Sequence, residues 1–171
     1  MAYKRNKDSA DVLIRKGIEI SLSINDSMMV ARGYNALAVL YSIHEDFDKS
    51  VDMNKLALKF NETLKDDVLN YLSYNNLAIT SMQKSNLSEA AAYAFQALDF
   101  AKEGCLSEAK MLFNLGTIFY KMDNNDQALN YFNKAEDLFI NLNISGYMYH
   151  IYNNLGALYH EKDERAYRDT A

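Results

Sequence analysis

Several features that are common in other proteins are absent from this sequence, and each absence excludes a class of protein. The chain has no proline and no strand-like alternation of apolar and polar residues, which together favour helices. Its single cysteine, Cys105, cannot form an internal disulfide, and no Cys-x-x-Cys motif is present. No stretch approaches the roughly 18 apolar residues that a membrane span requires, and residues 1–11 are too polar for a signal peptide. These absences predict a cytoplasmic, all-helical protein.

The signatures of catalysis and of nucleic-acid binding are missing as well. The 18 lysines and arginines against 23 aspartates and glutamates give a net charge of −5, with no basic cluster to bind phosphates. The sequence has no glycine-rich phosphate loop, no Gly-x-Ser-x-Gly element and no His-Glu-x-x-His motif. Its histidines, His44, His150 and His160, lack the spacing of metal ligands. We therefore expect a protein that is not an enzyme and that binds no cofactor, metal, nucleic acid or membrane.

What the sequence does contain is a short motif that returns at almost constant spacing. Each copy places asparagine beside Leu-Ala or Leu-Gly, or within two residues of it, and successive leucines are 40, 38 and 40 residues apart. The copies are Asn35-Ala36-Leu37-Ala38, Asn75-Asn76-Leu77-Ala78, Asn114-Leu115-Gly116 and Asn153-Asn154-Leu155-Gly156. Self-similarity at such a period is typical of a stacked array of repeats, so function is expected on a shared surface.

Small residues return with the same period in the second half of each unit. They stand at Ser50, Ala90 and Ala128, and again at Ala57, Ala97 and Ala135. Short side chains let two helix backbones approach closely, so each unit is predicted to be a pair of antiparallel helices. The residues expected to cap the second helices are Asp8, Asp48, Ser88 and Asp126. The shorter third period is assigned to a tighter junction, in which Gly104 ends a helix in the left-handed conformation.

The whole pattern resembles the tetratricopeptide repeat, a helix–turn–helix unit. The first helices carry a large residue at Tyr34, Tyr74, Leu112 and Tyr152, then the Leu-Ala or Leu-Gly pair, then an aromatic residue at Tyr41, Phe119 and Tyr159. Departures from the pattern occur at Ser50, Asn54, Ser81 and Ala94, and the closing proline of the family is absent. Because the family's usual period is about 34 residues, the chain is similar to its long-helix members: the kinesin light chain type, the spindle-orientation adaptors and the bacterial peptide-pheromone receptors.

The resemblance implies an all-α fold, a right-handed α-solenoid (superhelix) of antiparallel helix pairs. We expect one array over residues 1–171: a lone second helix at 8–24, repeats at 28–64, 67–103 and 106–142, and a partial repeat at 145–171. The array thus starts and stops within a repeat, and the ends of a solenoid need a polar outer face. We therefore expect a fragment of a longer protein, or exposed ends covered by a partner or by a second copy in a homodimer.

In this family the first helices line a concave groove, so the resemblance places peptide contacts beside the Leu-Ala and Leu-Gly pairs. The amides of an asparagine ladder can bond both the N–H and C=O groups of an extended peptide backbone. The expected peptide-binding residues are Asn35, Asn75, Asn76, Asn114, Asn153, Asn154, Arg32, Lys110, Phe113, Met82, Tyr120 and His150. The alternative is that these asparagines are only solvated, or bonded within their own unit.

Together, the residues and the resemblance predict a non-catalytic scaffold that binds a protein or an extended peptide in its groove. Tyr120, Met82 and Phe113 favour a partly apolar peptide, because aromatic anchors contribute most to such contacts. The alternative is a sensory or regulatory segment that binds a signalling peptide and controls an attached output domain, such as a DNA-binding, kinase or nucleotide-cyclase module.

Overall fold

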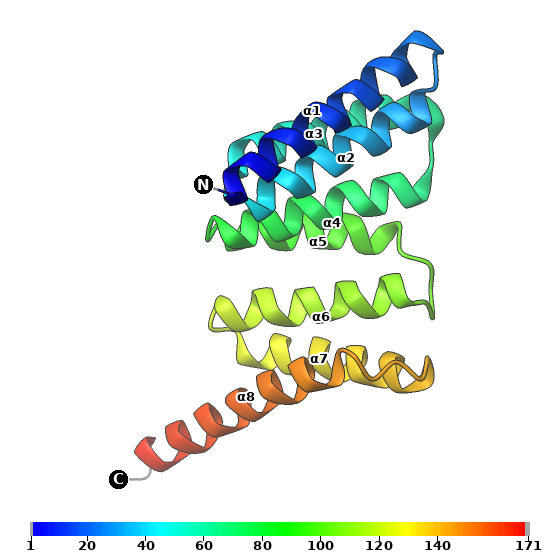
Figure 1. Ribbon diagram of the computed structural model, residues 1–171. Coiled ribbons are helices and arrows are strands. Elements are labelled where there is room, and N and C mark those ends of the chain that lie inside the picture. Colours follow the sequence, from blue (N-terminus) through cyan, green and yellow to red (C-terminus); the bar gives the residue numbers. More distant parts are fainter. Residues whose placement is uncertain (1, 170–171) are drawn as a thin grey trace. The chain divides into compact units, whose positions relative to one another are not determined.

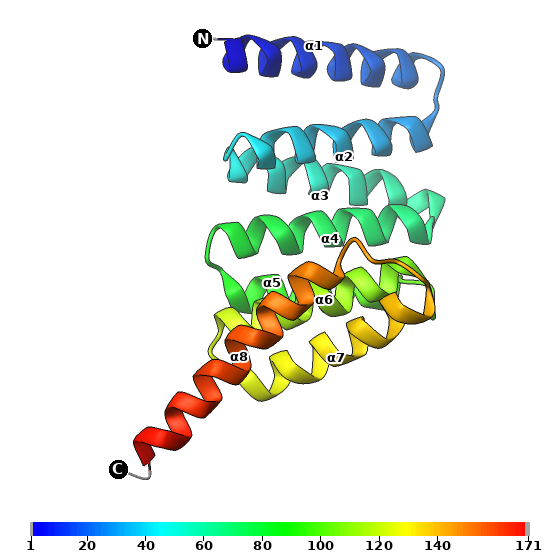
Figure 2. The same cartoon turned by 60° about the horizontal axis from the view of Figure 1, so that its bottom comes forward.

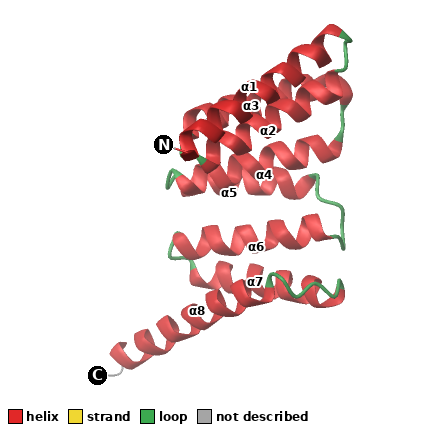
Figure 3. Cartoon of the chain, in the orientation of Figure 1, coloured by secondary structure: helices red, strands yellow, loops and turns green. Residues whose placement is uncertain are grey.

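The fold is helical throughout the part of the chain that the structure describes. The computed structural model describes the backbone of residues 2–169 and the side chains of residues 7–160. Residues 2–169 form eight α-helices and no strand, joined mostly by short turns (Figure 3). The helices are α1 (Ala2–Ser23), α2 (Ser27–Ile43), α3 (Phe47–Leu64), α4 (Asp67–Gln83), α5 (Leu87–Asp99), α6 (Leu106–Lys121), α7 (Asn125–Asn141) and α8 (Met148–Asp169). None of these described helices has an apolar stretch that would reach across a bilayer.

The helices fall into two compact units. Unit 1 spans Met1–Phe100 and contains α1 to α5, and unit 2 spans Ala101–Ala171 and contains α6 to α8. In unit 1 each helix packs on the next one along the chain, and α2 also contacts α4 (Figures 1 and 2). Ile18, Val30, Leu37 and Tyr41 form the buried cluster that joins α1 to α2. The expected fold of paired antiparallel helices is confirmed.

Unit 2 is built around the pair α6 and α7. Gly116 of α6 makes room for Phe132 of α7, because a Cβ atom on Gly116 would lie only 2.6 Å from the ring. Helix α8 packs on α7 and α6, and Figures 1 and 2 both show its C-terminal half extending beyond the start of α7. It continues to Asp169 with no turn after Lys162.

The turns between helices share one backbone design. One residue of each turn has a left-handed conformation, and these residues are Asn25, Glu45, Lys65, Ser85, Gly104, Asp123 and Asn143, spaced 19 or 20 apart. In most turns the next residue donates its backbone N–H to the carbonyl five positions earlier, as Asp46 does to Tyr41 at 2.9 Å. This bond ends the preceding helix in a Schellman arrangement. The same residue then begins the following helix, as when the Asp26 carboxylate accepts from the Met29 N–H at 3.0 Å.

This design corrects the expected helix starts. The residues that precede α3, α5 and α7 are Asp46, Asn86 and Asn124. The expected caps Asp48, Ser88 and Asp126 lie two positions later, in the first turn of each helix, and Asp8 lies inside α1. The expectation was wrong because it placed each cap just before an apolar run, whereas the left-handed residue of the turn fixes where the helix begins. Asp48 and Asp126 still favour the positive end of the helix dipole.

The shorter third period has a different origin from the expected one. Gly104 is left-handed, with φ of 69°, as predicted, but it does not end a helix, because α5 already ends at Asp99 and Gly104 directly precedes the N-cap of α6. The junction is not tight, however, because Phe100 to Cys105 is a longer connection than any turn of unit 1. The residues are missing from α5, which has only 13 residues, whereas α3 has 18 and α7 has 17.

Candidate interaction surface

The first helices of unit 1, α2 and α4, each leave one side uncovered. Along α2 this side carries Arg32, Ala36, Val39 and Ile43, all of them exposed. Spacings of three and four residues place side chains on one helix face. The residues at the same repeat positions on α4 are Leu72, Asn76, Ile79 and Gln83. Of these eight residues only Arg32 and Asn76 were predicted as peptide contacts, although the helical spacing would have revealed the others.

A groove of about 190 Å³ lies between these two stripes. Its lining is Ala38, Val39, Ser42 and Ile43 from α2, and Asn76, Ile79, Thr80 and Gln83 from α4. The walls are mainly apolar, and Ile43 is 61% exposed. At one end the Ser42 hydroxyl donates to Gln83 Oε1 at 2.8 Å and links the two helices.

Asn76 is the asparagine of this groove, and a buried neighbour holds its amide. Its Nδ2 donates to Oδ1 of Asn54 at 3.4 Å, and Nδ2 of Asn54 in turn donates to the Ser50 carbonyl at 3.1 Å. Among the described residues, no donor is bonded to the amide oxygen of Asn76. The amide therefore has an acceptor and a second N–H with which it can bond a peptide backbone.

The asparagine one position earlier in the motif faces elsewhere. Successive residues of an α-helix are rotated by about 100°, so Asn35 turns from the groove toward α4. It is 7% exposed, and its Oδ1 accepts from the Ser73 hydroxyl at 2.9 Å. Its Nδ2 has no partner among the described residues. Asn35 thus joins two first helices, while Asn75 is half-buried and Met82, also half-buried, lies outside the groove lining.

In unit 2 three of the predicted residues come together around Tyr147. The Tyr147 ring lies 5.9 Å from that of Phe113, and Lys110 Nζ lies 5.8 Å from the Tyr147 ring centre. The His150 ring is 6.5 Å from Phe113. Phe113 also packs on buried Phe132, at 5.8 Å between ring centres, so α7 fixes the position of this cluster. A cation and several ring faces can receive an aromatic or acidic side chain here.

The other predicted residues of unit 2 are distributed along α6 and α8. Asn114, Tyr120 and Asn154 are half-buried, and Asn153 is exposed. Thus the residues directly before the leucines, Asn114 and Asn154, keep part of their surface accessible, as Asn76 does in unit 1.

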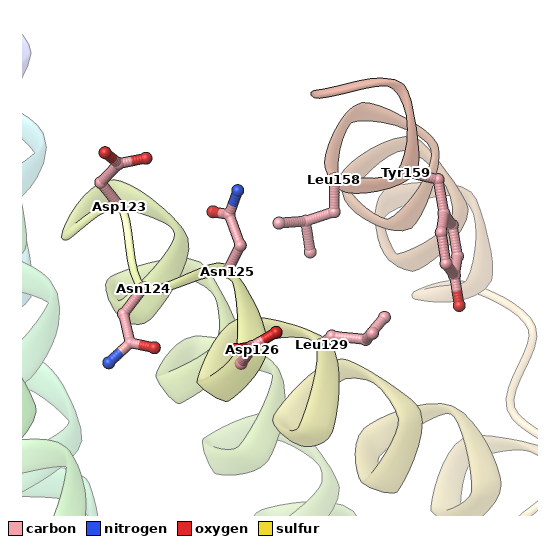
Figure 4. Close-up of a pocket in the computed structure, with 7 residues that line it drawn as sticks. All are labelled: Asp123, Asn124, Asn125, Asp126, Leu129, Leu158 and Tyr159. Atoms are coloured by element: carbon pink, nitrogen blue, oxygen red, sulfur yellow. The ribbon is translucent and has the colours of Figure 1, made fainter. Parts of the chain in front are cut away.

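A second cavity, of about 440 Å³, separates the start of α7 from α8. Its lining is Asp123, Asn124, Asn125, Asp126 and Leu129 from the turn and α7, with Leu158 and Tyr159 from α8. Figure 4 shows Asn125, Leu129 and Leu158 pointing toward the space between the two helices. None of these residues was predicted as a site, because the sequence does not show that α8 leans away from α7.

Comparison with known proteins agrees with this architecture. The sequence profile of the tetratricopeptide repeat matches residues 109–139, which cover most of α6 and α7. In this segment Gly116 of the Leu-Gly pair lies directly against the Phe132 ring of α7. Residues 109–139 therefore form one tetratricopeptide repeat.

A solved structure extends the likeness beyond one tetratricopeptide repeat. The crystal structure of BtubC (BKLC) from P. vanneervenii aligns with a TM-score of 0.78 and 24% sequence identity over 91% of this chain. The aligned chain spans 66% of the length of BtubC. No curated protein matches the sequence. The structural likeness shows that the tetratricopeptide-like solenoid fold extends over most of the chain.

Proposed function

We propose that this protein binds an extended, partly apolar peptide of a partner protein in the groove between α2 and α4. The single observation that carries the proposal is the Asn76 amide, held by buried Asn54 beside the exposed side chains of Val39 and Ile43. Asn76 would bond the peptide backbone, and the apolar wall would take a peptide side chain. Tetratricopeptide repeats are in general non-catalytic scaffolds for protein interaction, and we propose no enzymatic activity.

The cluster around Tyr147 is proposed as a second contact for the partner. Lys110, Phe113 and His150 offer one positive charge and aromatic faces in a small area of unit 2. Asn114 and Asn154, which precede the leucines of α6 and α8, would supply backbone bonds there, as is proposed for Asn76 in unit 1. The remaining predicted residues, Arg32, Asn75, Met82, Tyr120 and Asn153, are proposed as flanking contacts.

The test is to capture partners from the source lysate with matched variants and to identify them by mass spectrometry. Asn76→Ala and Ile43→Asp each remove one element of the groove and should reduce recovery of the partner. Ile140→Asp is the control, because Ile140 is 57% exposed on the second helix α7 and lies outside the groove. Equal recovery with Ile43→Asp and Ile140→Asp, in variants of unchanged helicity, would show that the groove is not the binding site.

The regulatory alternative uses the same groove but adds an output domain. Two observations distinguish this alternative from the scaffold hypothesis. The coding sequence on either side of this segment would show whether an output domain is attached, and an assay would show whether the captured peptide changes the activity of that domain. We propose the cytoplasm as the compartment on the basis of the single unpaired Cys105. Another copy of the chain is the second proposed partner, as a homodimer through the array ends.

A further inference from the structure

Two helix faces are open at repeat positions that are covered elsewhere in the molecule. By repeat position α1 corresponds to the second helices α3, α5 and α7, and α8 corresponds to the first helices α2, α4 and α6. Within the described part of unit 1, α1 packs only on α2. Within the described part of unit 2, α8 packs on α7 and α6. Among the described residues, neither helix contacts another at the position where its counterparts form a pair.

The open face of α1 is visible at a small residue. Ala57, Ala97 and Ala135 occupy the paired-helix position of the other second helices, and none is more than 1% exposed. The residue at this position of α1 is Gly17, which is exposed, and a Cβ atom on it would meet nothing within 4 Å. Beside it Leu13 is 69% exposed and Ile20 is 55% exposed. A large apolar surface on α1 thus has no cover among the described residues.

The open face of α8 is visible in the same way. A Cβ atom on Gly116 of α6 would collide with Phe132, whereas one on Gly156, the same position of α8, would meet nothing within 4 Å. Tyr152 and Tyr159 flank Gly156 and are 54% and 51% exposed. The Tyr152 hydroxyl is hydrogen-bonded to Glu136 of α7, which anchors the ring at the edge of this open face.

Contacts within the chain show how two such faces fit together. At one repeat position Tyr34 stacks on Phe60 at 5.7 Å, and Tyr74 stacks on Phe100 at 5.9 Å. The residues at these two positions in the open helices are Tyr152 of α8 and Ile20 of α1.

A second contact lies two helical turns away. Phe119 of α6 stacks on Tyr131 of α7 at 5.4 Å. The residues at the same positions in the open helices are Tyr159 of α8 and Leu13 of α1. The two open faces therefore have the residues of one helix pair, in the same antiparallel register.

We propose that α8 of one copy of this protein packs antiparallel on α1 of a second copy, with Tyr152 on Ile20 and Tyr159 on Leu13. The surfaces in contact are different on the two copies, so the interface is heterologous, and it produces a closed ring or an open filament of copies joined head to tail. It uses no residue of the proposed peptide groove. This assembly goes beyond a simple homodimer and differs from an isologous contact of α1 with α1.

The direct test is site-specific cross-linking in a Cys105→Ser background, which removes the native thiol. Protein with Leu13→Cys is mixed with protein with Tyr159→Cys and treated with a short bis-maleimide. We expect the mixed product to exceed either homodimer several-fold. The matched control replaces Tyr159→Cys by Asp52→Cys, an exposed position on α3, and should give only the collisional background.

Sedimentation velocity over a range of concentrations supplies the second measurement. The wild-type sedimentation coefficient should rise with concentration, whereas Leu13→Glu should remain monomeric with unchanged far-UV circular dichroism, because Leu13 is exposed in the single chain. Asn76→Ala should assemble as the wild type does, so failure of the groove proposal would leave this result intact. A wild type that is monomeric at every concentration, or a Leu13→Cys homodimer that forms as readily as the mixed product, would overturn the proposal.

Discussion

The cores of the two units use different chemistry at the same repeat positions. The buried polar residues of α3 and their counterparts on α7, 78 residues later, are Ser50 and Ala128, Asn54 and Phe132, and Asn61 and Phe139. On the helices that face them, Ser73 and Thr80 of α4 correspond to Ile151 and Leu158 of α8. Among residues 7–160, the fully buried polar side chains all belong to unit 1.

One repeat geometry thus accepts two ways of joining helices. In unit 1 the Ser50 and Thr80 hydroxyls are 3.1 Å apart, and such a bond fixes the position of α4 against α3. The counterparts Ala128 and Leu158 cannot form this bond, and Leu158 instead lines the cavity of about 440 Å³ beside α8. Hydrogen bonds fix the helix–helix contact in unit 1, whereas the shape of large side chains fixes it in unit 2.

The largest effect should come from truncating the ring at the centre of unit 2. Phe132→Ala should lower the free energy of unfolding by about 3–5 kcal/mol, because the side chain is fully buried and leaves a cavity. At the same position in unit 1, Asn54→Ala should cost only about 1–3 kcal/mol, the penalty of unpaired polar groups. Urea denaturation followed by far-UV circular dichroism measures both. If both variants lost the same free energy of unfolding, the apolar core of unit 2 and the polar core of unit 1 would not differ in how they stabilise the helix pairs.

A smaller effect tests the close helix contact of unit 2. Gly116→Ala should cost about 1–3 kcal/mol, because the added methyl meets the buried Phe132 ring at 2.6 Å. Gly156→Ala is the matched control and should stabilise the helix by about 0.5–1 kcal/mol, since nothing lies within 4 Å of the new atom. Thermal unfolding in dilute solution compares the stabilities of the two variants. Stability changes of the same sign in both would contradict the geometry of α6 and α7.

The polar contact of unit 1 can be tested by removing one partner or both. Thr80→Val keeps the shape of the side chain but leaves the buried Ser50 hydroxyl without its partner, at a cost of about 1–3 kcal/mol. The double variant Ser50→Ala with Thr80→Val should regain most of that loss, because it resembles the apolar pair found in unit 2. Chemical denaturation measures the free energy of unfolding of the single and the double variant. A double variant less stable than Thr80→Val would show that the hydroxyls make separate contributions.

The smallest effect concerns a partly buried contact between Asp11 of α1 and Tyr41 of α2. Burial raises the pKa of Asp11, but hydrogen bonds from Tyr41 and Arg15 outweigh it and hold the pKa below the usual 3.8. A lowered pKa in the folded state contributes stability above the unfolded pKa, and that contribution is lost as the pH falls through the folded value. The stability difference between wild type and Asp11→Asn should therefore be present at neutral pH and shrink below about pH 4. A difference that does not change with pH would exclude this ionic contribution.

The sequence predicted the fold well because the fold depends on spacing. The leucines and the small residues recur with the period of the helix pairs, and that period alone defines a repeat array. It did not predict the polar core, because Ser50 and Asn54 differ from the family pattern and no sequence pattern shows which hydroxyl or amide meets them across a helix pair.

The groove was predicted only in part for a related reason. Asn35 and Asn76 stand at neighbouring motif positions, and a rotation of about 100° between them sends one into the contact with Ser73 and the other into the groove. The exposed residues Val39 and Ile43 were not predicted, because an apolar side chain on a helix is usually buried in the core.

The turn design has a consequence for how such a chain can change. Most turns end one helix and start the next with two adjacent residues, for instance Glu45 and Asp46, so the smallest exchangeable module is a single helix with its turn, about 20 residues long. The short α5 shows that a helix can lose residues while the turns at its ends keep a left-handed residue. Chimaeras joined at these turns should therefore keep helix boundaries intact even when the parental helices differ in length.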